Sequence, residues 1–237
     1  MENYQIIRKS SWENVQFTTR LLTIEVFMKK TFYILFAFLL CIVLNGCLST
    51  FFPIFHEKDA FFNSNLLGTW KYNEDKHDHF MEFRKIPEYR KKELTPTITK
   101  ISDKGYLVTK MDSLENPTDQ SFVFLVSVGK NNYLDFYPAE LPSQKNINGF
   151  FKDHFIKIHT SYKIEFKDND HFEMKRFDKS FLDDLISNNK INIRHEFIEG
   201  NNVITANTDD LQKFIIQYSD NPKMFMTGIK CERSVYY

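Results

Sequence analysis

The stretch Tyr162–Lys175, which reads YKIEFKDNDHFEMK, decides the fold class. On both sides of Asp168–Asp170, apolar residues alternate with charged ones, and this period of two is typical of a β-strand with one face in water. A short polar turn between two such strands predicts an antiparallel hairpin. Phe122–Val128 and Tyr133–Tyr137 predict a second hairpin, whose first strand is apolar on both faces and therefore central.

Further stretches from residue 66 onward show the same β pattern, and two polar, proline-containing loops are expected at Ile86–Thr95 and Glu140–Lys152. The other predicted strands are Gly68–Tyr72, Phe80–Arg84, Tyr106–Met111, Phe155–His159, Ile191–Phe197, Val203–Ala206 and Phe225–Cys231.

Two helices interrupt the strands. Asp178 is expected to cap a helix over Lys179–Asn188, and Thr208 to cap one over Asp209–Ser219, because each stretch places its apolar residues on one face. Many short strands with two short helices predict a mainly β domain. We expect an antiparallel β-barrel or a strongly curved sheet.

The first predicted strand opens with Gly68-Thr69-Trp70, which resembles the Gly-x-Trp opening of lipocalins and of related bacterial lipocalin-like lipoproteins. In that family the Trp plugs the closed end of the barrel, and a basic residue of the last strand covers it. The resemblance implies that Gly68 and Trp70 mark this end, with Arg233 or Lys230 above the ring. A second short motif of the family is missing and helix 179–188 is extra, so Trp70 as a core aromatic of another β fold is the alternative.

The N-terminal part carries a separate signal, which begins at Met28. Two lysines and the apolar run Thr31–Leu44 precede Leu-Asn-Gly-Cys47, and these are the parts of a secretory signal peptide. The ending resembles the bacterial lipobox, in which the Cys is acylated and the chain is cut before it, although Asn45 departs from the usual small or apolar residue. An uncleaved anchor and an unmodified Cys47 are the alternatives.

This resemblance implies an order of segments along the chain. Residues 28–46 are a lipoprotein signal peptide, and residues 1–27, which carry nothing that such a peptide needs, are expected to be an upstream extension before the true start. Residues 47–62 form an aromatic tether anchored through Cys47, and residues 63–237 form a single lipocalin-like β domain. We expect the tether's Phe side chains to pack onto the domain, and a place in the bilayer interface is the alternative. Leu48 stands where inner-membrane retention would need Asp, so the resemblance implies an outer-membrane lipoprotein that faces the periplasm.

Composition excludes several classes of protein. The 31 basic and 31 acidic side chains balance, so the charge footprint of a nucleic-acid binder is absent. Apolar residues make up 42% and aromatic residues 16%, which is too much for intrinsic disorder. Seven Gly and seven Pro exclude collagen-like chains. With Cys47 acylated, Cys231 has no intramolecular disulfide partner.

Two groups of residues are candidates for chemistry. His77-Asp78-His79 is a close His pair that would need Asp75 or His171 to complete a metal site, but the stretch is expected to be a solvated turn, so no metal is predicted. Asp135 lies in an aromatic strand and His159 precedes two hydroxyl residues. We take these two as candidate polar anchors of a pocket, the alternatives being a place for Asp135 on the wet face and a hydrogen-bonded core histidine.

The sequence contains no nucleophile elbow, P-loop, dinucleotide glycine pattern or Cys-x-x-Cys, and no cofactor is expected. We therefore expect a lipid-anchored, non-enzymatic envelope protein that binds a small apolar ligand in its barrel. The alternative is a structural or assembly factor of the envelope that has a packed barrel and acts on an unknown protein partner through its surface.

Overall fold

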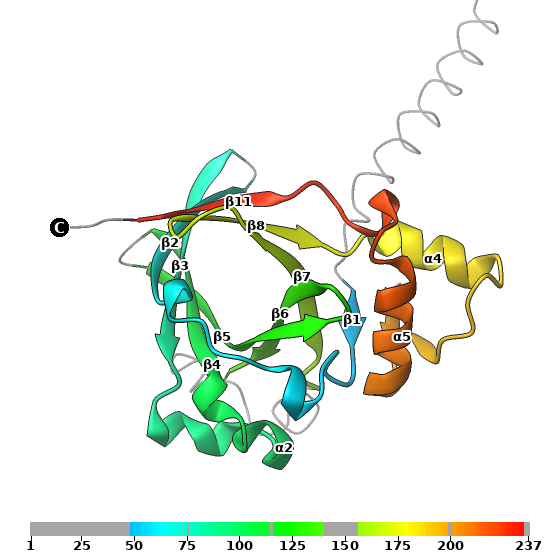
Figure 1. Ribbon diagram of the computed structural model, residues 1–237, viewed down its shortest axis with the longest axis horizontal. Helices are drawn as coiled ribbons and strands as arrows, with labels where there is room; N and C mark the ends of the chain where they lie inside the picture. The colour runs from blue at the N-terminus through cyan, green and yellow to red at the C-terminus, as the bar shows by residue number, and fades with distance from the viewer. Residues whose placement is uncertain (1–47, 75, 114–115, 140–155, 199–200, 235–237) are drawn as a thin grey trace, which may run out of the picture. The chain divides into compact units, whose positions relative to one another are not determined.

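The computed structural model describes residues 48–74, 76–113, 116–139, 156–198 and 201–234 (Figure 1). Eight antiparallel strands form a closed barrel, in which each strand pairs with its neighbours along the chain and β11 pairs with both β2 and β8. They are β2 (Gly68–Glu74), β3 (His77–Lys85), β4 (Gly105–Ser113), β5 (Asn116–Val128), β6 (Asn131–Pro138), β7 (His159–Phe166), β8 (His171–Arg176) and β11 (Ile229–Arg233). The predicted lipocalin-like antiparallel barrel is confirmed.

Three short strands extend the wall beside β7. They are β1 (Ser49–Thr50), β10 (Asn201–Ile204) and β9 (His195–Ile198). β1 runs antiparallel to the start of β7 and parallel to β10, which in turn pairs with β9. The first described residues are thus built into the same sheet as the barrel.

Alternation along the strands gives the barrel an apolar interior at one end. Trp70, Phe83 and Phe172 belong to a cluster of side chains that alternate with outward-facing ones and are almost completely buried. At the other end the inward-facing positions are polar. Glu74 and Arg176 form an ion pair of 2.8 Å there, and the Lys110 ammonium lies 5.7 Å from the centre of the Phe136 ring.

A second core lies on the outside of the barrel. Phe122, Phe124, Val126 and Tyr133 of β5 and β6 face outward and are buried beneath α4 (Lys179–Ser187), α5 (Thr208–Tyr218) and the chain that follows β1. Figure 1 shows both helices beside the β1 side of the barrel. This outer layer explains why β5 is apolar on both faces.

Both predicted helices are present, with one difference in capping. Asp178 caps α4 by accepting the backbone N–H of Ser180, as expected. The cap of α5 is Asn207, not Thr208, because its side chain accepts the N–H of Asp210. The Thr208 hydroxyl instead donates to the carbonyl of Pro53, at 2.9 Å.

Other boundaries also differ from the predictions. The prediction of a strand at Phe155–His159 is wrong. Residues 156–158 do not belong to a strand, and β7 begins at His159. The loop predicted at Ile86–Thr95 contains the short helix η3 (Glu88–Glu93) and leads into α2 (Pro96–Thr99). The loop predicted at Glu140–Lys152 lies outside the described residues.

The tether segment packs against the barrel, as expected. Leu48, Ile54 and Phe55 are buried, and Ala60 forms an antiparallel bridge with Val126 of β5. The domain therefore includes residues 48–62 as well as the chain from residue 63 onward. Cys47, the signal peptide and residues 1–27 lie outside the described residues.

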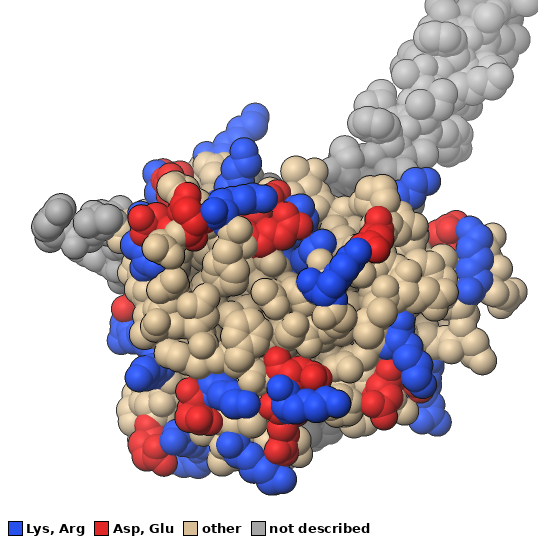
Figure 2. Space-filling view, in the orientation of Figure 1, with Lys and Arg blue, Asp and Glu red and all other residues tan. Residues whose placement is uncertain are grey.

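Charged side chains are unevenly distributed on the face shown in Figure 2. Lys and Arg alternate with Asp and Glu along its upper and lower edges, and a band of uncharged residues runs between them. Among the helices that the structure describes, none has the length and apolarity needed to cross a membrane.

Candidate functional site

Asp135 and His159 form a buried pair on neighbouring strands. The register of β6 and β7 places Asp135 opposite Ser161, so that His159 lies two residues away on the same face. Asp135 Oδ1 lies 2.5 Å from His159 Nδ1, and the Ser161 hydroxyl donates to Asp135 Oδ2 at 2.8 Å. All three side chains are buried, so the two candidate anchors predicted separately from the sequence are in contact.

This pair lies on the outside of the barrel wall. Along β6, Leu134 and Phe136 point into the barrel, while Tyr133, Asp135 and Tyr137 point out. The alternative in which Asp135 lies on a wet face is wrong, because the outer layer covers this face and leaves the Asp135 side chain 0% exposed. A carboxylate buried to this degree needs hydrogen-bond donors, and His159 and Ser161 supply them.

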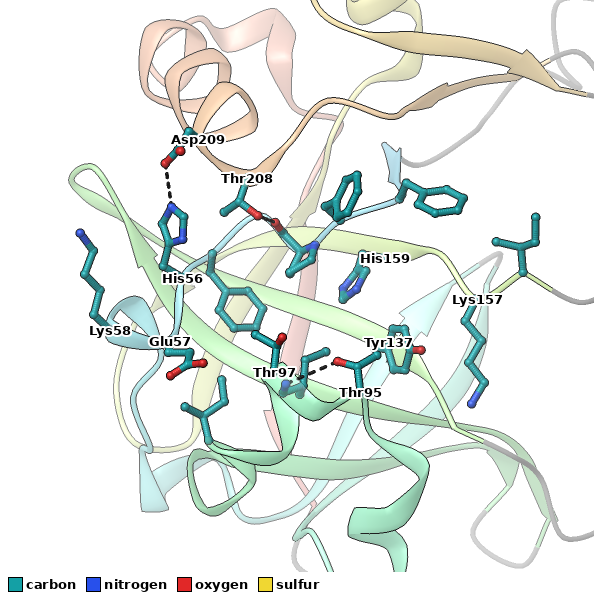
Figure 3. Close-up of a pocket in the computed structure, with 17 residues that line it drawn as sticks. His56, Glu57, Lys58, Thr95, Thr97, Tyr137, Lys157, His159, Thr208 and Asp209 are labelled. Atoms are coloured by element: carbon teal, nitrogen blue, oxygen red, sulfur yellow. Dashed lines mark hydrogen bonds and ion pairs between the residues drawn. The ribbon is translucent and has the colours of Figure 1, made fainter.

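His159 borders the pocket drawn in Figure 3, whose volume is about 1150 Å³. The pocket lies between the chain after β1, α2, the end of β6, the start of β7 and the first turn of α5. Most of its apolar lining comes from six side chains: Phe51, Phe52, Phe55, Ile98, Tyr137 and Ile156. The pocket is therefore outside the barrel and not in its lumen.

The imidazole has one nitrogen available to a ligand. An ionised carboxylate only accepts hydrogen bonds, so the N–H at Nδ1 of His159 donates to Asp135 and fixes the orientation of the ring. Asp135 does not line the pocket, and among the described residues Nε2 of His159 has no hydrogen-bond partner. The ring centre lies 4.9 Å from that of Tyr137, whose hydroxyl pKa is raised by burial. The pair thus presents Nε2 of His159 to a pocket whose lining is aromatic and aliphatic in its larger part and also includes Thr95, Thr97 and Thr208.

Charged side chains form the rim of this pocket. His56 Nε2 lies 2.9 Å from Asp209 Oδ1, and Glu57 is paired with Lys100 at 3.3 Å. Lys58 and Lys157 lie on opposite sides of the pocket in Figure 3. Neither lysine has a carboxylate within ion-pair distance among the described residues, although the Lys157 ammonium lies 5.5 Å from the centre of the Tyr137 ring.

The motif residues at the closed end of the barrel are also in contact. The guanidinium carbon of Arg233 lies 4.4 Å from the centre of the Trp70 ring, and the indole N–H donates to the carbonyl of Leu66 at 2.8 Å. Gly68 has a φ of +114°, and a Cβ there would lie 3.1 Å from Nη1 of Arg233. Of the two basic residues considered, Arg233 covers the ring, while Lys230 is exposed.

The His pair near the first hairpin lies on a strand. His77 and His79 belong to the start of β3 and not to the preceding turn, whereas the predicted contact with solvent is present, since His77 is exposed and His79 half-buried. The His79 ring stacks on Tyr72, with 5.5 Å between centres, and Asp78 forms an ion pair with Lys71. Within the part of the chain that the structure describes, no three His, Cys, Asp or Glu side chains are grouped as metal ligands.

The pocket lining was not predicted, with the exception of His159. Its members come from five places in the chain that no local pattern connects, and one of them, α2, was not among the predicted helices. The aromatic run after Cys47 was the one available signal, since Phe51, Phe52 and Phe55 are three of the lining residues. No family model, no curated protein and no solved structure matches this chain.

Proposed function

We propose that this protein is a lipid-anchored, non-enzymatic component of the cell envelope that binds a small apolar ligand with one polar group in the pocket outside the barrel. The observation that carries the proposal is the buried Asp135–His159 pair, which presents Nε2 of His159 to a mainly aromatic and aliphatic cavity. Few, well-placed polar groups in an apolar lining are typical of small-molecule sites.

The outer pocket is a better ligand site than the closed half of the lumen. The inward-facing side chains at that end are packed together, with the Trp70 and Phe172 ring centres 4.5 Å apart and both residues about 1% exposed. A volume of about 1150 Å³ places the outer pocket just above the usual size range of small-molecule sites. We therefore assign the ligand to the outer face and not to the barrel interior expected from the sequence.

The lipid anchor is proposed from the sequence of residues 28–47. A positive start, an apolar run of signal-peptide length and the Leu-Asn-Gly-Cys47 ending support acylation of Cys47. Leu48 after this cysteine supports the outer membrane, with the domain facing the periplasm. The ordered sheet begins at Ser49, so an acylated Cys47 would hold the domain close to the bilayer.

Native mass spectrometry of the full chain, extracted from its own membrane, tests both the lipid anchor and the bound ligand. We expect a mature chain that begins at Cys47 with added acyl mass and carries a bound small molecule. An acylated chain with no bound molecule would contradict the ligand proposal. A chain that retains residues 1–46 without acyl mass would contradict the anchor.

A second candidate function, a structural or assembly role through protein contacts, is favoured by an apolar edge of the sheet. β9 is the last strand of the extension, and Phe197 and Ile198 on it are 72% and 50% exposed. An open strand edge with exposed apolar side chains is suited to pairing with another chain. Crosslinking from position 197 in intact cells distinguishes this role from ligand binding alone. A structural or assembly role predicts a crosslink to one specific protein.

A further inference from the structure

Phe51 and Phe52 are two neighbouring aromatic side chains that remain largely exposed on the surface of the domain. Phe51 is 44% exposed and Phe52 is 45% exposed, and the two ring centres lie 5.8 Å apart at the mouth of the outer pocket. The backbone below them is fixed, because the N–H of Phe51 donates to the carbonyl of Ile204 at 2.8 Å and the Thr50 hydroxyl donates to the carbonyl of Phe52 at 2.7 Å. The pair is thus an apolar projection on a rigid base.

The position of Cys47 in the sequence, just before the two rings, indicates that a lipid bilayer covers them. Cys47, the proposed acylation site, is four residues before Phe51, and an extended chain covers about 3.3 Å per residue. The backbone of Phe51 therefore lies within about 13 Å of the anchored cysteine. Apolar rings on an interfacial element enter the boundary between headgroups and acyl chains to a depth of about 5–10 Å.

The charges around the two rings complement an anionic lipid surface. Lys58 and Lys157 border the pocket that contains both rings, and Arg194 borders a neighbouring depression that contains Phe52. None of these three cations has a carboxylate partner among the described residues. Of the acidic residues nearby, Glu57 is paired with Lys100 and Asp210 with Lys213, while Asp209 Oδ1 lies 2.9 Å from Nε2 of His56. The net effect is an apolar centre with available positive charge around it.

We propose that Phe51 and Phe52 insert into the bilayer interface as a second membrane contact, beside the anchor at Cys47, and that the mouth of the outer pocket thereby opens onto the lipid. The inference rests on the proposed lipid anchor for the position of the membrane. It adds that the domain has one preferred orientation on the bilayer. A ligand dissolved in the membrane then reaches His159 without crossing water.

Depth-dependent fluorescence quenching tests this contact. The full chain, purified from membranes with its anchor, is reconstituted into vesicles of phosphatidylcholine and phosphatidylglycerol at about 3:1, an anionic surface. Phe51→Trp and Phe52→Trp are compared with Tyr89→Trp, a matched control at a residue that is 70% exposed on η3. We expect brominated lipids to quench the first two variants several-fold more than the control. The tryptophan signal of the parent chain, from Trp70 and from Trp12 where it is retained, is subtracted.

The outcomes separate the contact from the anchor, because the intact mass of the same sample reports acylation. Equal quenching of the Phe51→Trp and Tyr89→Trp variants in an acylated chain overturns the contact and leaves the anchor standing. If no acyl mass is found, sedimentation of the unacylated chain with the same vesicles decides the contact. About tenfold weaker binding of the double variant Phe51→Ser, Phe52→Ser than of the parent supports it, and equal binding overturns it.

Discussion

His159 donates a hydrogen bond from Nδ1 to the carboxylate of Asp135, over 2.5 Å, on the outer surface of a barrel wall. The two residues are 24 positions apart and meet because β6 and β7 pair with Asp135 opposite Ser161. In an eight-stranded barrel of this kind a ligand is usually sought in the lumen. Here the buried polar pair faces the other side of the wall, and its His159 borders a pocket formed together with the N-terminal segment, α2 and α5.

Removal of the Asp135 carboxylate should destabilise the domain. In Asp135→Ala the Nδ1–H of His159 and the Ser161 hydroxyl lose their acceptor while buried, and we expect the free energy of unfolding to fall by about 2–4 kcal/mol. Asp119→Ala, at an exposed position of β5, is the matched control and should change it by less than about 0.5 kcal/mol. Urea denaturation measures both, and equal effects would contradict a structural role for the buried pair.

Arg233, whose guanidinium lies over the Trp70 ring at the closed end of the barrel, should stabilise the domain. Arg233 contacts the Trp70 ring and donates to the carbonyls of Asn65, Leu67 and Asn169, so Arg233→Ala should lower the free energy of unfolding by about 2–4 kcal/mol. Trp70 emission should shift to longer wavelength because the ring gains contact with water. Lys230→Ala is the control on the same strand, and a comparable loss of stability there would contradict the specific role of Arg233.

A side chain at position 68 should be poorly tolerated. Gly68 has a φ of +114°, which L-residues rarely adopt, and its Cβ would crowd Nη1 of Arg233. We expect Gly68→Ala to cost about 1–3 kcal/mol. Gly129→Asn is the comparison, since a Cβ there would also lie 3.1 Å from a neighbour, Cγ1 of Ile216, whereas its φ of +61° lies in the left-handed helical region that Asn tolerates. Thermal denaturation that ranked Gly129→Asn as the more destabilising change would contradict this explanation.

Stability should fall in alkaline solution. Burial raises the pKa of the Cys231 thiol above its ordinary value of 9.0 and raises the pKa values of Tyr72 and Tyr106 to about 12. These groups ionise at lower pH in the unfolded chain than in the folded one, so the stability that they contribute is complete below about pH 9 and is lost as the pH rises toward 12.

Urea denaturation between pH 7 and pH 11 measures this loss. Cys231→Ala should remove the part that begins near the ordinary thiol pKa and leave the part that begins near the tyrosine value of 10.0. A free energy of unfolding that stays constant or rises from pH 9 to pH 11 in the parent protein would contradict the burial of these groups.

Much of the fold was predictable because the alternation of side chains is local. The hairpin at Tyr162–Lys175 and the helix capped by Asp178 depend on neighbouring residues, and both are present. The strand predicted at Phe155–His159 failed because its start depends on pairing with β6, which is distant in sequence. Similarly, β1 has two residues and exists only through its partners β7 and β10.

The candidate site was predictable only in part. Asp135 and His159 could be selected as unusual residues, but their contact depends on a strand register that composition does not determine. Burial of the outer face of β6 depends on a covering layer that includes the chain after β1, α4 and α5, which are distant from it in sequence. The contact between Trp70 and Arg233 at the closed end of the barrel was easier to predict from the sequence. The resemblance to lipocalins implied that a basic residue of the last strand covers this Trp.

The proposed ligand site lies outside the barrel. The most direct measurement is titration of the full chain with the apolar fluorescent probe N-phenyl-1-naphthylamine, in the parent and in two variants that each fill one space. Thr97→Trp fills the outer pocket from an exposed position of α2, and Lys110→Trp fills the polar end of the lumen. We predict that Thr97→Trp weakens probe binding by about tenfold or more, equivalent to about 1.4 kcal/mol, while Lys110→Trp leaves it unchanged. Loss of binding in Lys110→Trp with full binding in Thr97→Trp would place the ligand in the barrel and contradict the claim.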